Sequence, residues 1–286
     1  MTITFTPSHP IWCAGCGHFG VKNAIVNALA AIDQPAHDTM VLAGIGCSGT
    51  IQNNIDSYGY HALHGRVLPT ALGVKLANPD LMVIAAGGDG DGYAIGAGHL
   101  VHAFKRNPSV VYVLMNNGIY GLTKGQRSPT AEQIDPTTER SIDGISLGLS
   151  IPGSSFLARA YSGAADQLNA VMVAALQHAA AGRGFAFVEV MSPCVTYNDT
   201  YADWSGRVSD VTAMEGYDPT SRIAAFSTVH TLAEQGRIPT GLIYQSDAPS
   251  YESAWKKEGF DVPARIDVSR SIHQNSYSSI MEKYAF

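Results

Sequence analysis

The chain has 286 residues, of which 45% are hydrophobic and 15% are charged, a composition typical of a well-buried globular protein. Its formal net charge of −6 argues against a nucleic-acid partner, because proteins normally meet nucleic acid with a basic surface. No apolar stretch approaches the roughly 20 residues that cross a bilayer, and the N-terminus lacks the basic and apolar regions of a secretory signal. We therefore expect a cytoplasmic protein that binds neither nucleic acid nor membrane.

Apolar runs of strand length alternate with helix-compatible segments through most of the chain, which predicts an α/β fold with a doubly wound parallel sheet. The expected elements are a helix at 17–31, a strand at 39–45, a helix at 66–77, a strand at 81–86, a helix at 93–105, a strand at 110–115, loops with short helices at 118–150, a strand at 155–161, a helix at 165–181 and a strand at 185–191. The pattern then weakens. We expect one domain over 1–205, followed over 206–286 by a helix near 220–236 and an extended C-terminal arm that packs on a partner subunit.

Two polar motifs follow neighbouring predicted strands. Gly88-Asp89-Gly90 follows the strand at 81–86, and Asn116-Asn117 follows the strand at 110–115. A right-handed crossover places the carboxyl ends of such strands side by side, where open α/β sheets bind ligands. A carboxylate and an amide oxygen there suit Mg²⁺ holding a diphosphate, and glycines allow close backbone approach. The alternative is an ordinary Asp-Gly turn beside a polar strand end.

All four cysteines are expected in loops at strand ends or helix starts. Cys13 and Cys16 form a C-x-x-C pair, and Cys47 and Cys194 follow strands that end at the same sheet edge as Asp89. Thiolates in this arrangement can bind zinc or an iron–sulfur cluster. Free buried cysteines and a disulfide are further alternatives, although a disulfide is unusual in a cytoplasmic chain. The spacing leaves zinc and a cluster both open.

The GDG and NN segments resemble the diphosphate-binding motif of thiamine diphosphate enzymes, which opens and closes with these residues. The resemblance implies that Asp89, Asn117 and the backbone carbonyl of Ile119 bind Mg²⁺. It also implies that Gly90 and Asp91 lie against the diphosphate.

Further motifs resemble the β subunits of the 2-oxoacid:ferredoxin oxidoreductases, in the order in which that family carries them. They are Trp12-Cys13-Ala14-Gly15-Cys16-Gly17-His18, Gly44-Ile45-Gly46-Cys47-Ser48, His64-Gly65-Arg66, GDGDG at 88–92, NNGIYGLTKGQ at 116–126, Ser128-Pro129-Thr130 and Ser192-Pro193-Cys194. The resemblance covers roughly residues 5–260, and its C-terminal part, from Ile238 to Tyr251, is less specific.

This resemblance implies three cofactors: thiamine diphosphate, Mg²⁺ and one [4Fe–4S] cluster. The implied cluster ligands are Cys13, Cys16, Cys47 and Cys194. The residues implied to line the thiamine diphosphate are Ile45, Gly46, Cys47, Ser48, His64, Gly90, Asp91, Gly121 and Leu122. Cys47 and its neighbours would then touch two cofactors at once.

The reaction implied is the oxidative decarboxylation of a 2-oxoacid, in which coenzyme A takes the acyl group and electrons leave one at a time through the cluster to ferredoxin. Thiamine diphosphate enzymes also need a Glu against the aminopyrimidine ring. In two-subunit members of the family an α subunit supplies the domain that carries it. We therefore expect an α₂β₂ assembly and no activity from this chain alone.

The identity of the 2-oxoacid is less defined by the sequence. The segment HGRVLPTALGVKLANP resembles 2-oxoglutarate members more than pyruvate members, although broad-specificity members share much of it. Candidate substrate-pocket residues are Thr50, Leu122, Lys124 and Arg127, where a cation could pair with a substrate carboxylate; solvated surface charge is the alternative. Two alternatives to the whole assignment remain. One is half of a non-redox thiamine diphosphate decarboxylase with a structural zinc. The other is a catalytically inactive electron-transfer or assembly subunit that carries a cluster.

Overall fold

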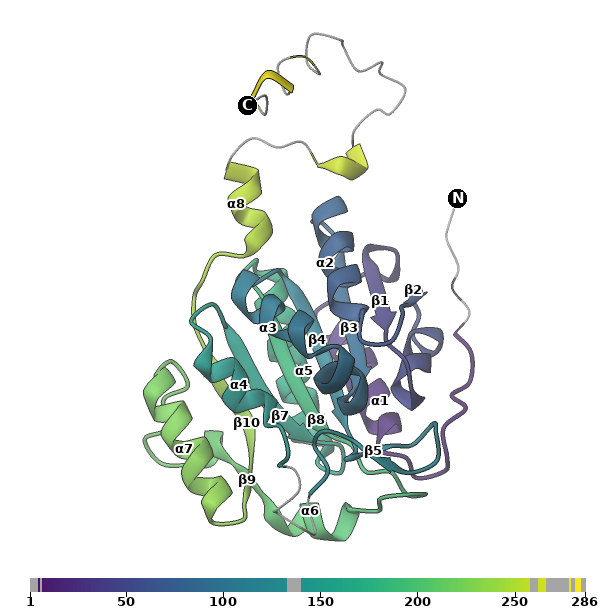
Figure 1. Ribbon diagram of the computed structural model, residues 1–286, viewed down its shortest axis with the longest axis vertical. Coiled ribbons are helices and arrows are strands. Elements are labelled where there is room, and N and C mark those ends of the chain that lie inside the picture. The colour runs from purple at the N-terminus through teal and green to yellow at the C-terminus, as the bar shows by residue number, and fades with distance from the viewer. Residues whose placement is uncertain are drawn as a thin grey trace.

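The computed structural model describes residue 5 and residues 7–132, 140–257, 262–265, 278 and 281–283. One central sheet runs through this part of the chain, with helices on both of its faces (Figure 1). None of the helices described is long and apolar enough to span a bilayer.

The sheet has eight strands among the described residues, in the order β2-β1-β3-β4-β8-β7-β10-β9. The first six of these run parallel, and β10 pairs antiparallel with β7. The central strands are apolar almost throughout because helices cover both faces of the sheet. The strands are β1 (Thr39–Ala43), β2 (Tyr58–His61), β3 (Met82–Gly88), β4 (Val110–Asn116), β7 (Phe156–Tyr161), β8 (Ala186–Met191), β9 (Val208–Asp210) and β10 (Ile238–Gln245), with a separate short hairpin of β5 (Ile119–Tyr120) and β6 (Gln126–Arg127).

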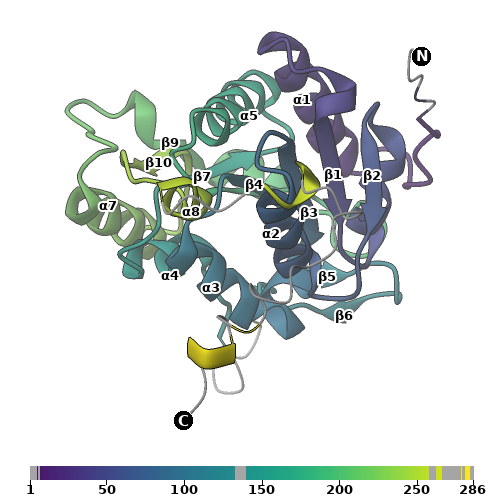
Figure 2. The same ribbon diagram turned by 90° about the horizontal axis from the view of Figure 1, so that it is seen from above.

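Two helical layers enclose the sheet, as the view from above shows (Figure 2). Helices α1 (His18–Ala31) and α5 (Ala165–Ala180) bury one face, while α2 (Val67–Ala77), α3 (Ala97–Arg106), α4 (Gly144–Ser150) and α7 (Arg222–Glu234) bury the other. The remaining helical segments are η1 (Ala36–Asp38), η2 (Cys47–Asn54), the π-helical η3 (Gly90–Ile95), α6 (Tyr201–Arg207), η4 (Val211–Ala213), α8 (Tyr251–Lys257) and η5 (Pro263–Arg265).

The predicted α/β fold with its largely parallel sheet is confirmed, and each predicted strand and helix up to residue 191 has a counterpart. The predicted extended arm is wrong for residues 238–245, which form β10 and join the sheet. Pro239 and Gly241 interrupt the apolar pattern there and obscure the strand in the sequence. The predicted helix at 93–105 begins only at Ala97, because the residues before it form the π-helical turn η3.

The predicted division at residue 205 stays a prediction, although β9 and β10 extend the same sheet as the first domain. Most of the expected arm after residue 257 lies outside the described residues.

Candidate functional site at the carboxyl edge of the sheet

Four neighbouring parallel strands, β1, β3, β4 and β8, end at the same edge of the sheet. The segments that follow them are 44–48, 89–92, 117–124 and 192–198. These segments contain every predicted metal or cluster ligand except Cys13 and Cys16. The topology therefore brings together residues that lie far apart in the chain.

Asp89 is a buried carboxylate that several donors hold in place. Its Oδ2 accepts hydrogen bonds from Ser128 Oγ at 2.5 Å and Gly118 N at 3.1 Å, and Thr130 Oγ1 also lies 2.5 Å away. Burial raises the pKa of this carboxyl group, and the hydroxyl donors oppose that rise. A buried carboxylate held in this way is suited to binding a hard cation.

Asn117 lies beside Asp89 at the start of the turn that leads into β5. Its Oδ1 accepts a hydrogen bond from Ile119 N at 3.0 Å, and its backbone carbonyl accepts one from Asn198 Nδ2 at 2.8 Å. Gly118 has a φ of 70°, which favours glycine and permits the tight turn between them. Asp89, Asn117 and Ile119 all line one cavity of about 100 Å³.

Asp91 is also buried, but its hydrogen bonds are to the neighbouring loops. Its Oδ1 accepts from Ile45 N at 2.9 Å and Gly65 N at 2.8 Å, and His64 Nδ1 lies 3.1 Å away. Burial raises its pKa, while these two backbone donors and His64 oppose the rise. Asp91 therefore fixes the loops that carry Ile45 and His64, two of the predicted cofactor-lining residues.

The four cysteines line a second cavity of about 460 Å³. Cys16 N donates to Cys13 O at 3.0 Å, which closes the C-x-x-C turn, and the adjacent Gly17 N donates to Pro193 O at 3.0 Å. This contact brings the turn next to Cys194. Burial raises the pKa of the Cys16 thiol to about 11, and the three other thiols add to the rise.

Cys47 is held at the wall between the two cavities. Trp12 Nε1 donates to the carbonyl of Cys47 at 2.7 Å. A Cβ atom built on Gly121 would lie 3.5 Å from Cys47 Sγ and 3.7 Å from Cys194 Sγ, so both thiols converge on this glycine. Within the described residues, no group of three or more His, Cys, Asp or Glu side chains is close enough to hold a single metal ion.

The two cavities share a wall. The residues that line both are His18, Ile45, Gly46, Cys47, Asn117, Gly121 and Leu122. Thr50 and Lys124 line only the larger cavity, beside the cysteines, and Ser48, His64, Gly90 and Asp91 line only the smaller one. Arg127, in β6, is exposed and lines neither cavity.

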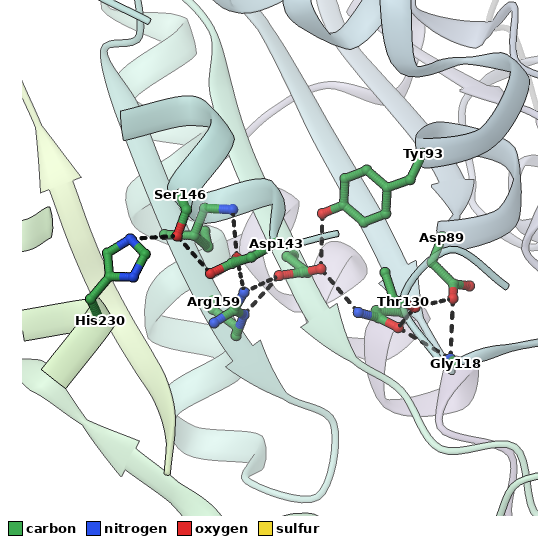
Figure 3. A network of polar contacts seen from close by, with 11 residues as sticks. Asp89, Tyr93, Gly118, Thr130, Asp143, Ser146, Arg159 and His230 are labelled. Atoms are coloured by element: carbon green, nitrogen blue, oxygen red, sulfur yellow. Dashed lines mark hydrogen bonds and ion pairs between the residues drawn. The ribbon is translucent and has the colours of Figure 1, made fainter. Parts of the chain in front are cut away.

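A buried polar network behind the site was not predicted from the sequence. It runs from Asp89 through Thr130 and Asn116 to the carboxylate of Glu189 on β8. From there it continues through Arg159 to Asp143 (Figure 3). The signals in the sequence are Glu189 and Arg159, the lone charged residues in the apolar strands AFVEVM and FLARAY. A charge in such a strand requires buried partners.

Comparison with known proteins first defines the class. A family described as "Thiamine pyrophosphate enzyme, C-terminal TPP binding domain" matches residues 44–190, the region that contains both polar motifs. A second family, which describes the C-terminal part of the pyruvate ferredoxin oxidoreductase beta chain, matches residues 194–258. The fold, the loops at its carboxyl edge and the first family match together define a thiamine diphosphate-binding domain.

Similar proteins then define the family. The chain is 38% identical over 282 residues to a 2-oxoacid:ferredoxin oxidoreductase subunit beta from Sulfolobus sp, covering 92% of this chain and 90% of that relative. It is 39% identical over 195 residues to the 2-oxoglutarate oxidoreductase subunit KorB of Mycobacterium tuberculosis, covering 66% and 51%. This chain belongs to the β subunits of the 2-oxoacid:ferredoxin oxidoreductases, which confirms the predicted family.

A solved structure agrees with this assignment. It is the 2-oxoglutarate:ferredoxin oxidoreductase from Magnetococcus marinus with 2-oxoglutarate, coenzyme A and succinyl-CoA bound. The TM-score is 0.84 at 33% identity, and the match covers 97% of this chain and 94% of that one.

Proposed function

We propose that this chain is the catalytic β subunit of a coenzyme A-dependent 2-oxoglutarate:ferredoxin oxidoreductase. It would hold thiamine diphosphate with Mg²⁺ in the smaller cavity and a [4Fe–4S] cluster in the larger one. The observation that carries the proposal is the shared wall: a cavity lined by four thiols adjoins a cavity lined by Asp89 and Asn117. A cluster in the larger cavity would supply a one-electron acceptor beside the residues that would hold thiamine diphosphate.

The residues present fit both groups. Asp89 is a buried carboxylate, and a bound cation would offset the cost of burying its charge. Burial and, to a lesser degree, the neighbouring thiols raise the pKa of Cys16 and Cys47, so thiolates at these two residues are unfavourable without positive charge nearby. Iron supplies that charge, and cysteine thiolates are its usual ligands in such clusters.

In the proposed site, Asp89, Asn117 and the Ile119 carbonyl would hold Mg²⁺, and Cys13, Cys16, Cys47 and Cys194 would hold the cluster. When bound, thiamine diphosphate supplies the electron sink for decarboxylation. The chain's own residues position this chemistry: Asp91 holds the loops after β1 and before α2, and Trp12 holds the Cys47 carbonyl. An α subunit, in an α₂β₂ assembly, would supply the activating Glu, and ferredoxin would receive the electrons.

Two substitutions, each expected to remove one cofactor and leave the other, test the two sites in the co-purified complex with the α subunit. Asp89→Ala should abolish Mg²⁺-dependent thiamine diphosphate binding and leave the broad visible absorption of the cluster, which dithionite bleaches. Cys194→Ser should remove that absorption. Stoichiometric zinc with no visible absorption would instead support the alternative of a decarboxylase half with structural zinc. Full activity in Asp89→Ala would refute the metal site.

The preference for 2-oxoglutarate rests on the M. tuberculosis relative and the M. marinus structure, which are named for that substrate, and on one cation. Lys124 and Arg127 are both exposed, but only Lys124 lines the larger cavity. It lies there with Leu122, which also lines the smaller cavity, so Lys124 could pair with the distal carboxylate of a 2-oxoglutarate bound at the wall between the two. Lys124→Met should raise the KM for 2-oxoglutarate at least about 10-fold and leave that for pyruvate within about 2-fold, measured by methyl viologen reduction. Arg127→Met is the matched control. Pyruvate as the better substrate of the wild-type complex would refute the preference.

We also propose that the purified chain alone has no activity. Turnover of any 2-oxoacid by this chain without its α subunit would refute that part.

A further inference from the structure

The carboxylate of Glu189 lies in the middle of β8 and is only 1% exposed. Its strand neighbours Val188 and Val190 are fully buried. Burying a carboxylate in such surroundings is costly unless donors satisfy both of its oxygens. The donors found here come from η3, β4 and β7, and one of them, Asn116, directly precedes the candidate metal ligand Asn117.

One oxygen of this carboxylate contacts both chain segments that carry the proposed Mg²⁺ ligands. Glu189 Oε1 accepts a hydrogen bond from Tyr93 Oη at 2.8 Å and from Asn116 Nδ2 at 3.0 Å (Figure 3). Tyr93 lies in η3, in the turn that begins directly after Asp89, and Asn116 immediately precedes Asn117. Glu189 Oε1 therefore links the segment that follows Asp89 to the segment that carries Asn117.

The other oxygen is held by Arg159 on β7. Arg159 Nε and Nη2 both lie 2.7 Å from Glu189 Oε2, and Nη2 also lies 2.6 Å from Asp143 Oδ1. A guanidinium that meets one carboxylate through two nitrogens restricts its orientation. Rotation of the Glu189 carboxylate would break these contacts, so Oε1 stays directed at the candidate site.

Because a carboxylate only accepts hydrogen bonds, Glu189 also determines which way the Asn116 amide points. With Nδ2 toward Glu189, Asn116 Oδ1 faces Gly118 N at 3.1 Å and Thr130 Oγ1 at 2.8 Å. The same Gly118 N and Thr130 Oγ1 also lie within hydrogen-bonding distance of Asp89 Oδ2. Reversing the amide would place its NH₂ group against the Gly118 N–H and remove the acceptor that Thr130 Oγ1 shares between Asn116 and Asp89, which would disturb the shell around Asp89.

We propose that Glu189 is the positioning residue of the metal–diphosphate site, acting through Tyr93 and Asn116 without touching the cofactor. This inference rests on the proposed function, since it assumes that Asp89 and Asn117 bind Mg²⁺. The role requires a charged carboxylate. A buried ion pair adds little to stability compared with apolar residues of similar size, so stability alone does not account for it.

Glu189→Gln in the complex with the α subunit is the main test. Arg159 would retain the side-chain oxygen, so the new NH₂ group would face Tyr93 and Asn116 and turn the Asn116 amide over. We expect the Mg²⁺ concentration that half-saturates thiamine diphosphate binding to rise at least about 10-fold, with altered selectivity for Mg²⁺ over Ca²⁺ and an unchanged cluster absorption. Tyr93→Phe, which removes one of the two contacts to Oε1, should give a smaller shift in the same direction, at least about 3-fold.

Glu252→Gln is the matched control. Glu252 is also buried, and both of its oxygens accept from Ser109 N at 3.2 Å, at the opposite end of β4. We expect this change to lower the melting temperature and to leave the Mg²⁺ dependence unchanged.

The proposal is overturned if Glu189→Gln lowers the melting temperature as Glu252→Gln does and leaves the Mg²⁺ dependence at its wild-type value. Should Glu189→Gln fail to fold, an unchanged Mg²⁺ dependence in Tyr93→Phe overturns it equally. A wild-type complex that binds no thiamine diphosphate in the presence of Mg²⁺ overturns the proposed function instead, so the two failures are distinguishable.

Discussion

A single methyl group added at Gly44 should disrupt the cofactor cavity. Gly44 is buried directly after β1, and a Cβ atom there would lie 2.6 Å from Asp91 Cγ and 2.8 Å from Asp91 Oδ1, overlapping the other oxygen as well. The carboxylate cannot easily move away, because Ile45 N and Gly65 N both donate to it. Gly44→Ala therefore displaces Asp91 from these two loops.

The magnitude follows from the two backbone hydrogen bonds. A hydrogen bond to a charged group contributes about 1.5–3 kcal/mol, so losing both costs roughly 3–6 kcal/mol. In the proposed site thiamine diphosphate needs both loops in place, so binding to the variant must offset this cost. Since about 1.4 kcal/mol corresponds to a tenfold change in affinity, Gly44→Ala should weaken thiamine diphosphate binding at least about 100-fold.

Isothermal titration of the complex with thiamine diphosphate at fixed Mg²⁺ measures this loss. Gly73→Ala is the matched control, because Gly73 lies in α2 with open space around its Cβ position. It should leave the affinity unchanged and stabilise the fold by about 0.5–1 kcal/mol. In an Asp91→Ala background the overlap is absent, so Gly44→Ala should have no additional effect. Wild-type affinity in the single Gly44→Ala variant would refute the reasoning.

Three further predictions concern the rest of the fold. Burial lowers the pKa of His178 from its ordinary 6.5 to about 4, so it is neutral when folded, and unfolding takes up a proton below pH 6.5. The free energy of unfolding should therefore fall by up to about 3 kcal/mol from about pH 6.5 to about pH 4, and denaturant titrations should show a flatter dependence in His178→Gln. Phe104 is fully buried, and its ring lies edge-on to Phe185 and Phe187 with centroid distances of 5.4 and 5.3 Å. Phe104→Ala should therefore lower the free energy of unfolding in urea by about 3–5 kcal/mol. A loss below about 1 kcal/mol would contradict the packing. The Arg222 guanidinium donates to several backbone carbonyls at and after the end of α4. Arg222→Met should therefore lower the melting temperature, and Arg222→Lys should restore only part of the loss. Full rescue by lysine would show instead that charge alone suffices.

The central part of the fold could be predicted because its signals are local. Runs such as Val110–Met115 are continuous, β-branched and fully buried, as a parallel strand covered on both faces must be. Once the parallel order of the strands is inferred, topology alone places Asp89 next to Asn117 and brings Cys47 and Cys194 to the same edge. That juxtaposition needs no knowledge of side-chain geometry.

Features that depend on long-range contacts could not be predicted. Glu189 is only an isolated polar interruption until Arg159 and Asn116 are seen beside it. The strand β10 carries Pro239 and Gly241, so its assignment depends on its pairing with β7 and β9. The role of Asp91 in joining two loops was likewise hidden, since its partners Ile45 and Gly65 approach one another only in the folded chain.

The way the cysteine cavity is closed has a consequence for biosynthesis. The C-x-x-C turn near the start of the chain meets the segment after β8: Gly17 N donates to Pro193 O, and His18 Nδ1 lies 2.7 Å from Ser192 Oγ across 174 residues of sequence. Contacts of such separation form only when the intervening sheet is in place. A nascent chain that has not yet emerged past Cys194 therefore lacks this cavity, and any group that all four cysteines hold can be completed only once the segment after β8 is made.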